Sequence, residues 1–262
     1  MRHLLLLALV AALCSCSHID EQDQLIYVKP QPAKRSVLLE DFTGQNCPNC
    51  PLGSDIIEQL QSDPDFGDRV IAVGIHGGPL GYKQTAGSSE TGLATAVGDE
   101  YYDHWRLEYQ PVGLIDRHGA VNYPDWIGRV KEELQTTSVV TMGVEAAVNG
   151  SQIDIAVTGE CTDGTYKGKL QVWLLEDSIV AIQRMPNGSR DRSYMHHHVL
   201  RTPVNGTWGE DVDMSEGQRQ QHIMSMHIDP EWNKEHLSVV AFVYNDKGVE
   251  QTVKAKVMPA AD

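Results

Sequence analysis

Two cysteines separated by two residues carry the clearest chemical signal in the sequence. Cys47 and Cys50 stand where an apolar run gives way to a helical pattern. Attack on a disulfide needs a thiolate, and a thiol at a helix N-terminus faces unpaired N–H groups and the positive end of the helix dipole, which lower its pKa. Cys47 is therefore predicted to be an exposed nucleophile, and Cys50, one turn later, to resolve the mixed disulfide. The same spacing also suits a structural disulfide that staples a helix start in an exported protein.

The residues before Thr137 alternate between apolar runs and helical stretches. Strands are predicted over residues 36–42, 69–75, 110–116 and 119–122, and helices over 52–61, 93–109 and 125–134. This alternation is typical of strand-helix-strand units with parallel pairing, so residues 35–137 are predicted to form an α/β domain. A Gly-rich loop from His76 to Gly92 follows the second strand. His76 is placed near the cysteines, although the glycines after it could serve only to make a turn.

After Thr137 the helical period disappears and short β-rich segments follow. Strands are predicted over residues 139–148, 152–161, 169–175, 178–183, 223–228, 237–244 and 249–257. Turn signals such as Asn149-Gly150 and Asp163-Gly164 separate them. Antiparallel strands at this spacing favour an immunoglobulin-like β-sandwich over residues 138–262.

The predicted α/β domain resembles the thioredoxin fold in the residues around the cysteines. Asp41 precedes Cys47 by six residues, which is the place of the buried acid in thioredoxins, and the resemblance implies that Asp41 accepts a proton from Cys50. Glu40 is the rival for this role, because a slip of one residue exchanges the two faces of a strand. Pro111 stands where thioredoxins carry a cis-proline opposite the cysteines, and an X-Pro bond is one at which the cis form costs little.

Two features depart from typical thioredoxins. Asn46 replaces the aromatic residue usually found before the first cysteine, and the Gly-rich loop over residues 76–92 is an insertion. Both changes lie next to the cysteine pair. They are expected to alter the way substrates are handled.

The first 34 residues are predicted to direct export. A charged start is followed by an apolar run that ends at Leu13, too short to cross about 30 Å of hydrocarbon. Residues 13–16, Leu-Cys-Ser-Cys, resemble the lipobox of bacterial lipoproteins, which implies a signal peptide over 1–15 and a lipid anchor on Cys16. Cys14 is the alternative anchor, and an ordinary secretory signal without lipid remains open. Residues 16–34 suit an extended tether, because they are polar and contain Pro30 and Pro32.

The composition and the remaining chemical residues narrow the other possibilities. A formal net charge of −15 argues against nucleic acid as a partner. Cys161 has no partner in this assignment and is expected to be a buried, inert thiol. Two further groups invite a metal: His196, His197 and His198, of which the first and last would share a strand face, and the histidines and methionines of residues 222–227, which could bind copper. Without carboxylate or cysteine ligands at suitable spacing, and with methionines on strands mostly core residues, no metal and no cofactor are predicted.

The sequence resembles the Omp28-related outer membrane lipoproteins of Bacteroidetes. The residues that carry the resemblance are 40–45, Glu-Asp-Phe-Thr-Gly-Gln, leading into Cys47-Pro48-Asn49-Cys50-Pro51, together with the lipobox and residues 198–201, His-Val-Leu-Arg. The resemblance implies a thioredoxin-like domain, a β-sandwich, and a lipid anchor in the outer membrane, on its periplasmic or surface face.

Two functions are compatible with that build. The chain could be a thiol-disulfide oxidoreductase that uses Cys47, Cys50, Asp41 and Pro111 on envelope client proteins. Alternatively, it could be a surface binding protein or adhesin in which Cys47 and Cys50 form a structural disulfide. The partners expected are envelope or surface proteins in both cases, as thiol clients or as adhesion targets.

Overall fold

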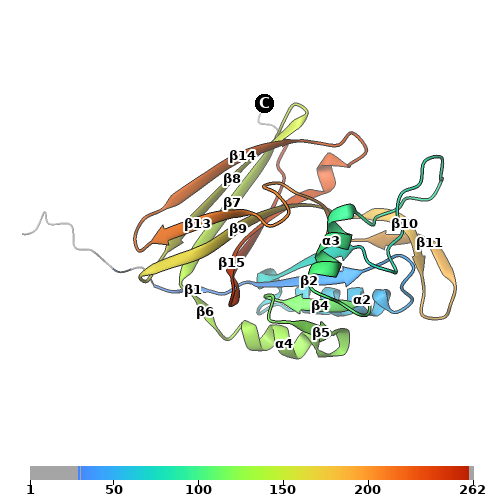
Figure 1. The fold of residues 1–262 in the computed structure, drawn as a ribbon, viewed down its shortest axis with the longest axis horizontal. Coiled ribbons are helices and arrows are strands. Elements are labelled where there is room, and N and C mark those ends of the chain that lie inside the picture. Colours follow the sequence, from blue (N-terminus) through green and yellow to red (C-terminus); the bar gives the residue numbers. More distant parts are fainter. Residues whose placement is uncertain (1–28, 30, 260–262) are drawn as a thin grey trace, which may run out of the picture.

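The computed structural model describes Lys29 and residues 31–259 (Figure 1). The predicted signal peptide over 1–15, the predicted anchor Cys16 and most of the predicted tether lie outside the described residues. Within the described part of the chain, no helix is both long and apolar enough to cross a membrane.

The first part of the described chain is an α/β region. Its elements are β1 (Ala33–Lys34), β2 (Val37–Thr43), α2 (Cys50–Gln61), β3 (Val70–His76), α3 (Ala96–His104), β4 (Val112–Ile115), β5 (Ala120–Asn122), α4 (Trp126–Glu133) and β6 (Thr137–Ser138). Strand β2 pairs parallel with β3 and antiparallel with β4. Alternate residues of β2 face opposite sides: Leu39 packs with residues of α2 and α4, whereas Leu38 packs against Tyr101 of α3. Helices therefore cover both faces of these strands.

The predicted helix over 93–109 is shorter in the structure. Helix α3 begins after Thr95, whose side chain accepts a hydrogen bond from the Gly98 N–H, a standard N-cap. It ends at His104, and Arg106 adopts a positive φ of 52°. The chain therefore leaves the helical direction well before the strand that follows.

The second part of the described chain is a β-sandwich. Its strands are β7 (Val140–Asn149), β8 (Gln152–Cys161), β9 (Thr165–Glu176), β10 (Ile179–Arg184), β11 (Arg190–His196), β12 (Val199–Pro203), β13 (Glu210–Ser215), β14 (Gln220–His227), β15 (Leu237–Asn245) and β16 (Gly248–Lys256). A three-stranded sheet, in the order β14-β8-β7, packs its inner face on β9, β13, β15 and β16 (Figure 1). The β-sandwich expected after residue 137 is confirmed, but the pattern did not predict β11, β12 or β13.

One sheet runs through both parts of the chain. Strand β12 lies between β9, to which it is antiparallel, and β3, to which it is parallel, so the sheet has the order β16-β15-β9-β12-β3-β2-β4-β5. A single core cluster contains Phe42 of β2 together with Trp173 of β9 and Phe242 of β15. Residues on both sides of the predicted boundary at 137 thus share one sheet and one core.

Strands β10 and β11 form a separate antiparallel hairpin. It extends beyond the end of the sandwich, on the side of the molecule that carries α2 and α3 (Figure 1). We call residues 179–196 the cap hairpin. Its position brings a segment from the second half of the chain over the cysteines of the first half.

Candidate functional site

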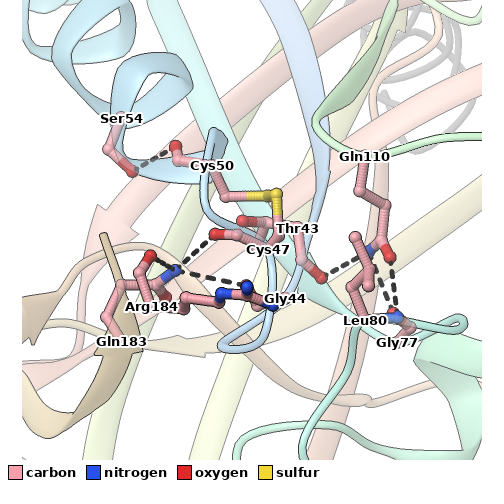
Figure 2. Close-up of a disulfide and its surroundings, with 10 residues drawn as sticks. All are labelled: Thr43, Gly44, Cys47, Cys50, Ser54, Gly77, Leu80, Gln110, Gln183 and Arg184. Carbon is pink, nitrogen blue, oxygen red and sulfur yellow. Dashed lines mark hydrogen bonds between the residues drawn. A yellow bond between two sulfur atoms is a disulfide. The ribbon is translucent and has the colours of Figure 1, made fainter. Parts of the chain in front are cut away.

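Cys47 and Cys50 form a disulfide at the beginning of α2 (Figure 2). Cys50 is the first residue of the helix, and Pro51 lies in the first turn, where its missing N–H costs no helix hydrogen bond. The loop before the helix is folded tightly, because the Cys47 N–H donates to the Gly44 carbonyl at 3.0 Å. A side chain at Gly44 would overlap the backbone of Leu80. Only a glycine at position 44 lets this loop lie so close to the Gly-rich segment.

The disulfide is buried. Cys47 is 0% exposed and Cys50 is 1% exposed, so the expectation of an exposed Cys47 nucleophile is wrong for this state of the molecule. The cap hairpin explains the burial. The Gln183 side chain donates to the Cys47 carbonyl at 2.8 Å (Figure 2). The Arg184 N–H donates to the Gln45 carbonyl at 2.8 Å.

The Gly-rich segment closes another side of the site. The Asn46 N–H donates to the Leu80 carbonyl at 3.0 Å, and the Asn46 side chain donates to the Gly81 carbonyl at 3.2 Å. The Gln110 side chain donates to the carbonyls of Thr43 and Gly77, at 2.7 and 3.0 Å, and accepts from the Leu80 N–H at 3.1 Å (Figure 2). Asn46 and the Gly-rich segment thus hold each other in place next to the disulfide.

The peptide bond between Gln110 and Pro111 is cis, as predicted. Pro111 lies against α2, since a Cβ atom placed on Gly53 would come within 3.5 Å of the Pro111 side chain. Gly53 is three residues after Cys50 in the same helix. The structure therefore brings Pro111 to the helix that carries the disulfide.

Asp41 and Glu40 lie on opposite faces of β2. Asp41 is opposite Gly74 of β3 in register and shares the face of Leu39, which packs with residues of α2. Glu40, on the other face, accepts hydrogen bonds from Arg117 at 3.0 to 3.3 Å. The strand register thus directs Asp41, and not its rival, towards the helix of the cysteines.

Asp41 is 3% exposed, and its Oδ1 atom has no hydrogen-bond partner among the described residues. Burial raises the pKa of its carboxyl group from 3.8 to about 8, because the charged form loses its hydration without gaining a partner. At neutral pH this carboxyl group is therefore mostly protonated, and can exchange a proton close to physiological pH.

A cavity of about 570 Å³ is lined by both Asp41 and Cys50. Its lining includes Asp41, Cys50, His76, Gln183, Tyr194 and His196. The rings of His76 and His196 are 5.3 Å apart between centroids, and both side chains are buried. The sequence placed His76 near the cysteines, but nothing local in the sequence indicated that His196, 120 positions later in the numbering, would join it.

The histidines of residues 196–198 do not lie on a single strand. His196 and His198 do not share a strand face, because β11 ends at His196 and the chain turns at His198, where φ is 56°. His198 instead contacts Asp177 at 2.9 Å. Met224 and Met226 pack against the sandwich core, as expected for strand methionines. Over Lys29 and residues 31–259, no group of three or more His, Cys, Asp or Glu side chains is placed to hold a metal ion.

Cys161 is buried and free of any disulfide, which confirms the expectation of an isolated buried thiol. Its Sγ atom lies 3.2 Å from the Asp163 carbonyl oxygen. The residue belongs to β8, in the sheet that contains neither Cys47 nor Cys50. It therefore plays no part in the site.

The fold and the family of the chain follow from comparison with known proteins. HBP35 of Porphyromonas gingivalis has the same overall fold, with a TM-score of 0.69 at 14% sequence identity over 89% of this chain and 79% of that chain. A domain of the outer membrane lipoprotein Omp28 from Porphyromonas gingivalis is 26% identical over 47% of this chain and 92% of that chain, with a TM-score of 0.35. No curated protein sequence matches the chain. Residues 98–260, more than half of the sequence, match the family described as outer membrane protein Omp28, so the predicted resemblance is confirmed and the chain belongs to the Omp28 family.

Proposed function

We propose that this protein is a lipid-anchored thiol-disulfide oxidoreductase of the cell envelope. In this proposal, residues 35–137 are a thioredoxin-like unit, residues 138–262 are an immunoglobulin-like sandwich, and Cys16 carries the lipid that holds the chain on the periplasmic or surface face of the outer membrane. The partners are envelope or surface proteins that contain disulfides or thiols. Membership of an outer membrane protein family supports the location.

The observation that carries the proposal is the position of a buried, unpartnered carboxyl group beside the disulfide. Asp41 lines the same cavity as Cys50, and Pro111 contacts the same helix from another direction. A disulfide that only staples a helix has no need of such a carboxyl group, and burying one without a partner destabilises the fold. Titratable groups with strongly shifted pKa values are more common at functional sites.

The chemistry proposed is reversible exchange between two disulfides. In the reduced protein, the Cys47 thiolate attacks a client disulfide, forming a Cys47–client bond while the second client sulfur leaves as a thiolate. Cys50 then gives its proton to Asp41 in its ionised form, the minor form at neutral pH, and attacks the Cys47 sulfur. The Cys47–client bond breaks, the client leaves as a thiolate, and the Cys47–Cys50 disulfide forms. An envelope dithiol would reduce the pair again by the reverse steps.

This exchange requires the cap hairpin to move. With Cys47 fully buried, no client sulfur can approach it in the closed arrangement. At the disulfide itself the hairpin is held by the hydrogen bonds of Gln183, Arg184 and Gln45. Further away it packs on Leu93 and pairs Arg192 with Glu90. A hairpin outside the main sheet can open locally while the rest of the molecule stays folded.

Capture of clients tests the proposal directly. A Cys50→Ser variant cannot resolve the mixed disulfide, so it is expected to accumulate client proteins joined to Cys47 and released by reductant. The Cys47→Ser, Cys50→Ser double variant is the matched control and should capture none. A reduction potential far below about −300 mV, with no captured client, would contradict the proposal.

The burial of the disulfide favours a second function, that of an envelope or surface binding protein with a structural Cys47–Cys50 pair. The outer side of the three-stranded sheet adds to this reading, because Ile223 and Met258 are 76% and 57% exposed there. In that case the double Cys→Ser variant would keep full binding to envelope or host surfaces. Loss of that binding together with client capture would instead favour the oxidoreductase.

A further inference from the structure

Three buried polar atoms without hydrogen-bond partners belong to side chains that line the cavity next to Cys50. They are Oδ1 of Asp41, Nδ1 of His76 and Nε2 of His196. The three side chains are 3%, 3% and 6% exposed. Buried polar atoms nearly always have partners, so three without any among the described residues, in one cavity, need an explanation.

Three strands bring these side chains together. In the register of β2 and β3, Asp41 is opposite Gly74 and Thr43 is opposite His76, so Asp41 and His76 share the face that looks towards α2. The chain after the cap hairpin passes over Gly74, whose N–H donates to the His198 carbonyl at 2.8 Å. This crossing sets His196 against His76, with the ring planes at 71°.

One ring nitrogen of His196 has no partner. Nε2 is buried and accepts or donates no hydrogen bond among the described residues. The backbone of Ala181 and Ile182 offsets part of the effect of burial on the His196 pKa. In the tautomer that carries its proton on Nδ1, Nε2 presents a lone pair that can accept a proton.

We propose that His76 and His196 relay the proton of Cys50 from Asp41 to solvent through water in this cavity. The inference rests on the thiol-disulfide exchange proposed above and adds two residues that act through Asp41. The cavity is polar and, at about 570 Å³, large enough for bridging water. The histidine nearer the end of the path belongs to the cap hairpin, so the same segment that covers the disulfide would also complete its proton path.

In the resolving step, the Cys50 proton passes to Asp41 in its ionised form, which is the minor form near pH 7, as the Cys50 sulfur attacks Cys47. Water then carries a proton from Asp41 to the unpaired nitrogen of a neighbouring imidazole, and the imidazolium releases one to solvent. The client leaves as a thiolate, so one proton and one thiolate appear for each disulfide formed. The client disulfide is the oxidant, and no further reagent is consumed.

Both imidazoles rest neutral and would be protonated only transiently, because burial raises the pKa of Asp41 and lowers those of the two histidines. Burial lowers the pKa of His196 to about 4 and that of His76 well below its usual value, with the neighbouring histidine and Arg201 also lowering the pKa of His76. Both rings are therefore neutral near pH 7 and can accept a proton. The other titratable groups that line the cavity are Asp55, Glu58, Tyr194, His197 and His198.

The relay can be tested on the reduced protein with the aromatic disulfide dithiobis(nitrobenzoate), in a Cys161→Ser background. Attack by Cys47 releases a first equivalent of coloured thiolate, and closure by Cys50 releases the second. We expect His76→Asn and His196→Gln to slow the second phase about tenfold near pH 7 and to leave the first unchanged. The difference should shrink at alkaline pH, where hydroxide can remove the proton directly.

Two controls separate a relay from a structural role. The same substitution at a distant site, His222→Gln, should change neither phase. In His196→Ala, imidazole added to the buffer should restore the second phase, which a purely structural histidine would not allow. If the His76 variant fails to fold, the His196 variants carry the test alone.

The outcomes also separate this inference from the proposed function. A wild-type protein that releases both equivalents and captures clients, with a second phase that neither histidine changes at any pH, would overturn the relay and leave the oxidoreductase intact. A reduced wild-type protein that never forms the Cys47–Cys50 disulfide with the reagent would overturn both.

Discussion

Burial in the folded protein raises the pKa of the Asp41 carboxyl group from 3.8 to about 8. Between about pH 4 and pH 8 the native state holds this proton and the unfolded chain does not, so stability falls as the pH rises across that window. Asn cannot ionise. We therefore expect Asp41→Asn to flatten the pH dependence of the unfolding free energy and to be more stable than the wild type at pH 8, by up to about 5 kcal/mol.

Denaturant unfolding at pH 5 and pH 8 measures this difference. Asp116 also has a raised pKa, of about 7, but it is present in both proteins, so its contribution cancels. Asp65→Asn is the control, because Asp65 is exposed. An equal difference between wild type and Asp41→Asn at both pH values would contradict the raised pKa.

Glu40 and Arg117 form a buried ion pair on the other face of β2. Their side chains are 0% and 2% exposed, and the guanidinium carbon of Arg117 lies 4.3 Å from the ring centroid of Tyr244 and 4.8 Å from that of Phe242. Removing one partner leaves an uncompensated buried charge. We expect Arg117→Met or Glu40→Leu to lower the unfolding free energy by about 3–5 kcal/mol, and the double variant to recover most of that loss.

Urea unfolding of the four proteins forms a double-mutant cycle for this pair. Additive losses in the double variant would show that the two residues do not act as a pair. Arg129 and Glu132 form an exposed ion pair on α4. The control variant Arg129→Glu, Glu132→Arg, in which the two residues swap positions, is expected to change the unfolding free energy by less than about 1 kcal/mol.

Local sequence was enough to find some residues of the site and not others. The cysteine pair follows from its spacing, and the cis bond at Pro111 was expected from the resemblance to thioredoxins, whereas the choice between Asp41 and Glu40 required the register of β2. His196 and Gln183 could not be found in this way, because both are more than 130 positions from the cysteines in the sequence. Gln183 nevertheless donates a hydrogen bond to Cys47, and His196 lines the cavity next to Cys50. Partners this distant are chosen by tertiary packing, on which periodicity and propensity carry no information.

At the scale of elements, the cap hairpin is the part that decides whether the disulfide is accessible. The Gln183 side chain donates to the carbonyls of Cys47, Gly44 and Arg184. A typical hydrogen bond contributes about 1 kcal/mol. We expect Gln183→Ala to favour opening and to speed reduction of the disulfide by dithiothreitol about tenfold, as followed by thiol labelling with mass spectrometry.

Arg190→Ala is a matched control in the same hairpin, because Arg190 is exposed. It should leave the reduction rate within about twofold of the wild type, since surface substitutions have small effects. Equal rates for Gln183→Ala and the wild type would show that opening of the hairpin does not limit access. Global unfolding would then be the route by which reductant reaches Cys47.

Elements with a strong local pattern were predicted within a few residues, and those without one were missed. Strands β2 and β3 each contain an apolar run, over residues 37–39 and 70–73, and every residue of both strands is buried. Strand β11 has the sequence Arg-Asp-Arg-Ser-Tyr-Met-His and is largely exposed, so hydrophobic alternation could not reveal it. Strand β11 is stabilised by its antiparallel pairing with β10, and such pairing is not visible in the sequence of one strand alone.

At the scale of the whole molecule, the shared sheet makes the two parts of the chain depend on each other. Strand β12 joins β9 to β3, and the Trp173 Nε1–H of β9 donates to the Tyr101 hydroxyl of α3 at 3.1 Å. The sequence predicts a division at residue 137, because the helical period of the hydrophobic residues disappears there. The pairing of β3 with β12 cannot be predicted in this way, since it joins residues 125 positions apart through the single register pair Val199 and Gly74.

The shared core leads to a prediction about unfolding. A fragment of residues 35–137 would expose Leu38, Phe42 and Ile71, which in the full chain are covered in part by Trp173, Leu175 and Phe242. Each fully buried side chain of this kind contributes about 1.5–3 kcal/mol, a large share of the stability of a small domain. We therefore expect this fragment to lack a cooperative unfolding transition, and the longer chain from residue 31 to residue 259 to unfold in one step.

Two probes in different parts of the chain distinguish one unfolding unit from two. Trp126 lies in the core beside α2, and Trp173 lies in the core shared with the sandwich, so variants that retain only one of them report each region by fluorescence. Coincident denaturant midpoints are expected, because separating the parts would expose the shared core to water. Two separate midpoints, or a folded 35–137 fragment, would show that the α/β region is stable without β12 and that the cap hairpin could move away together with the sandwich.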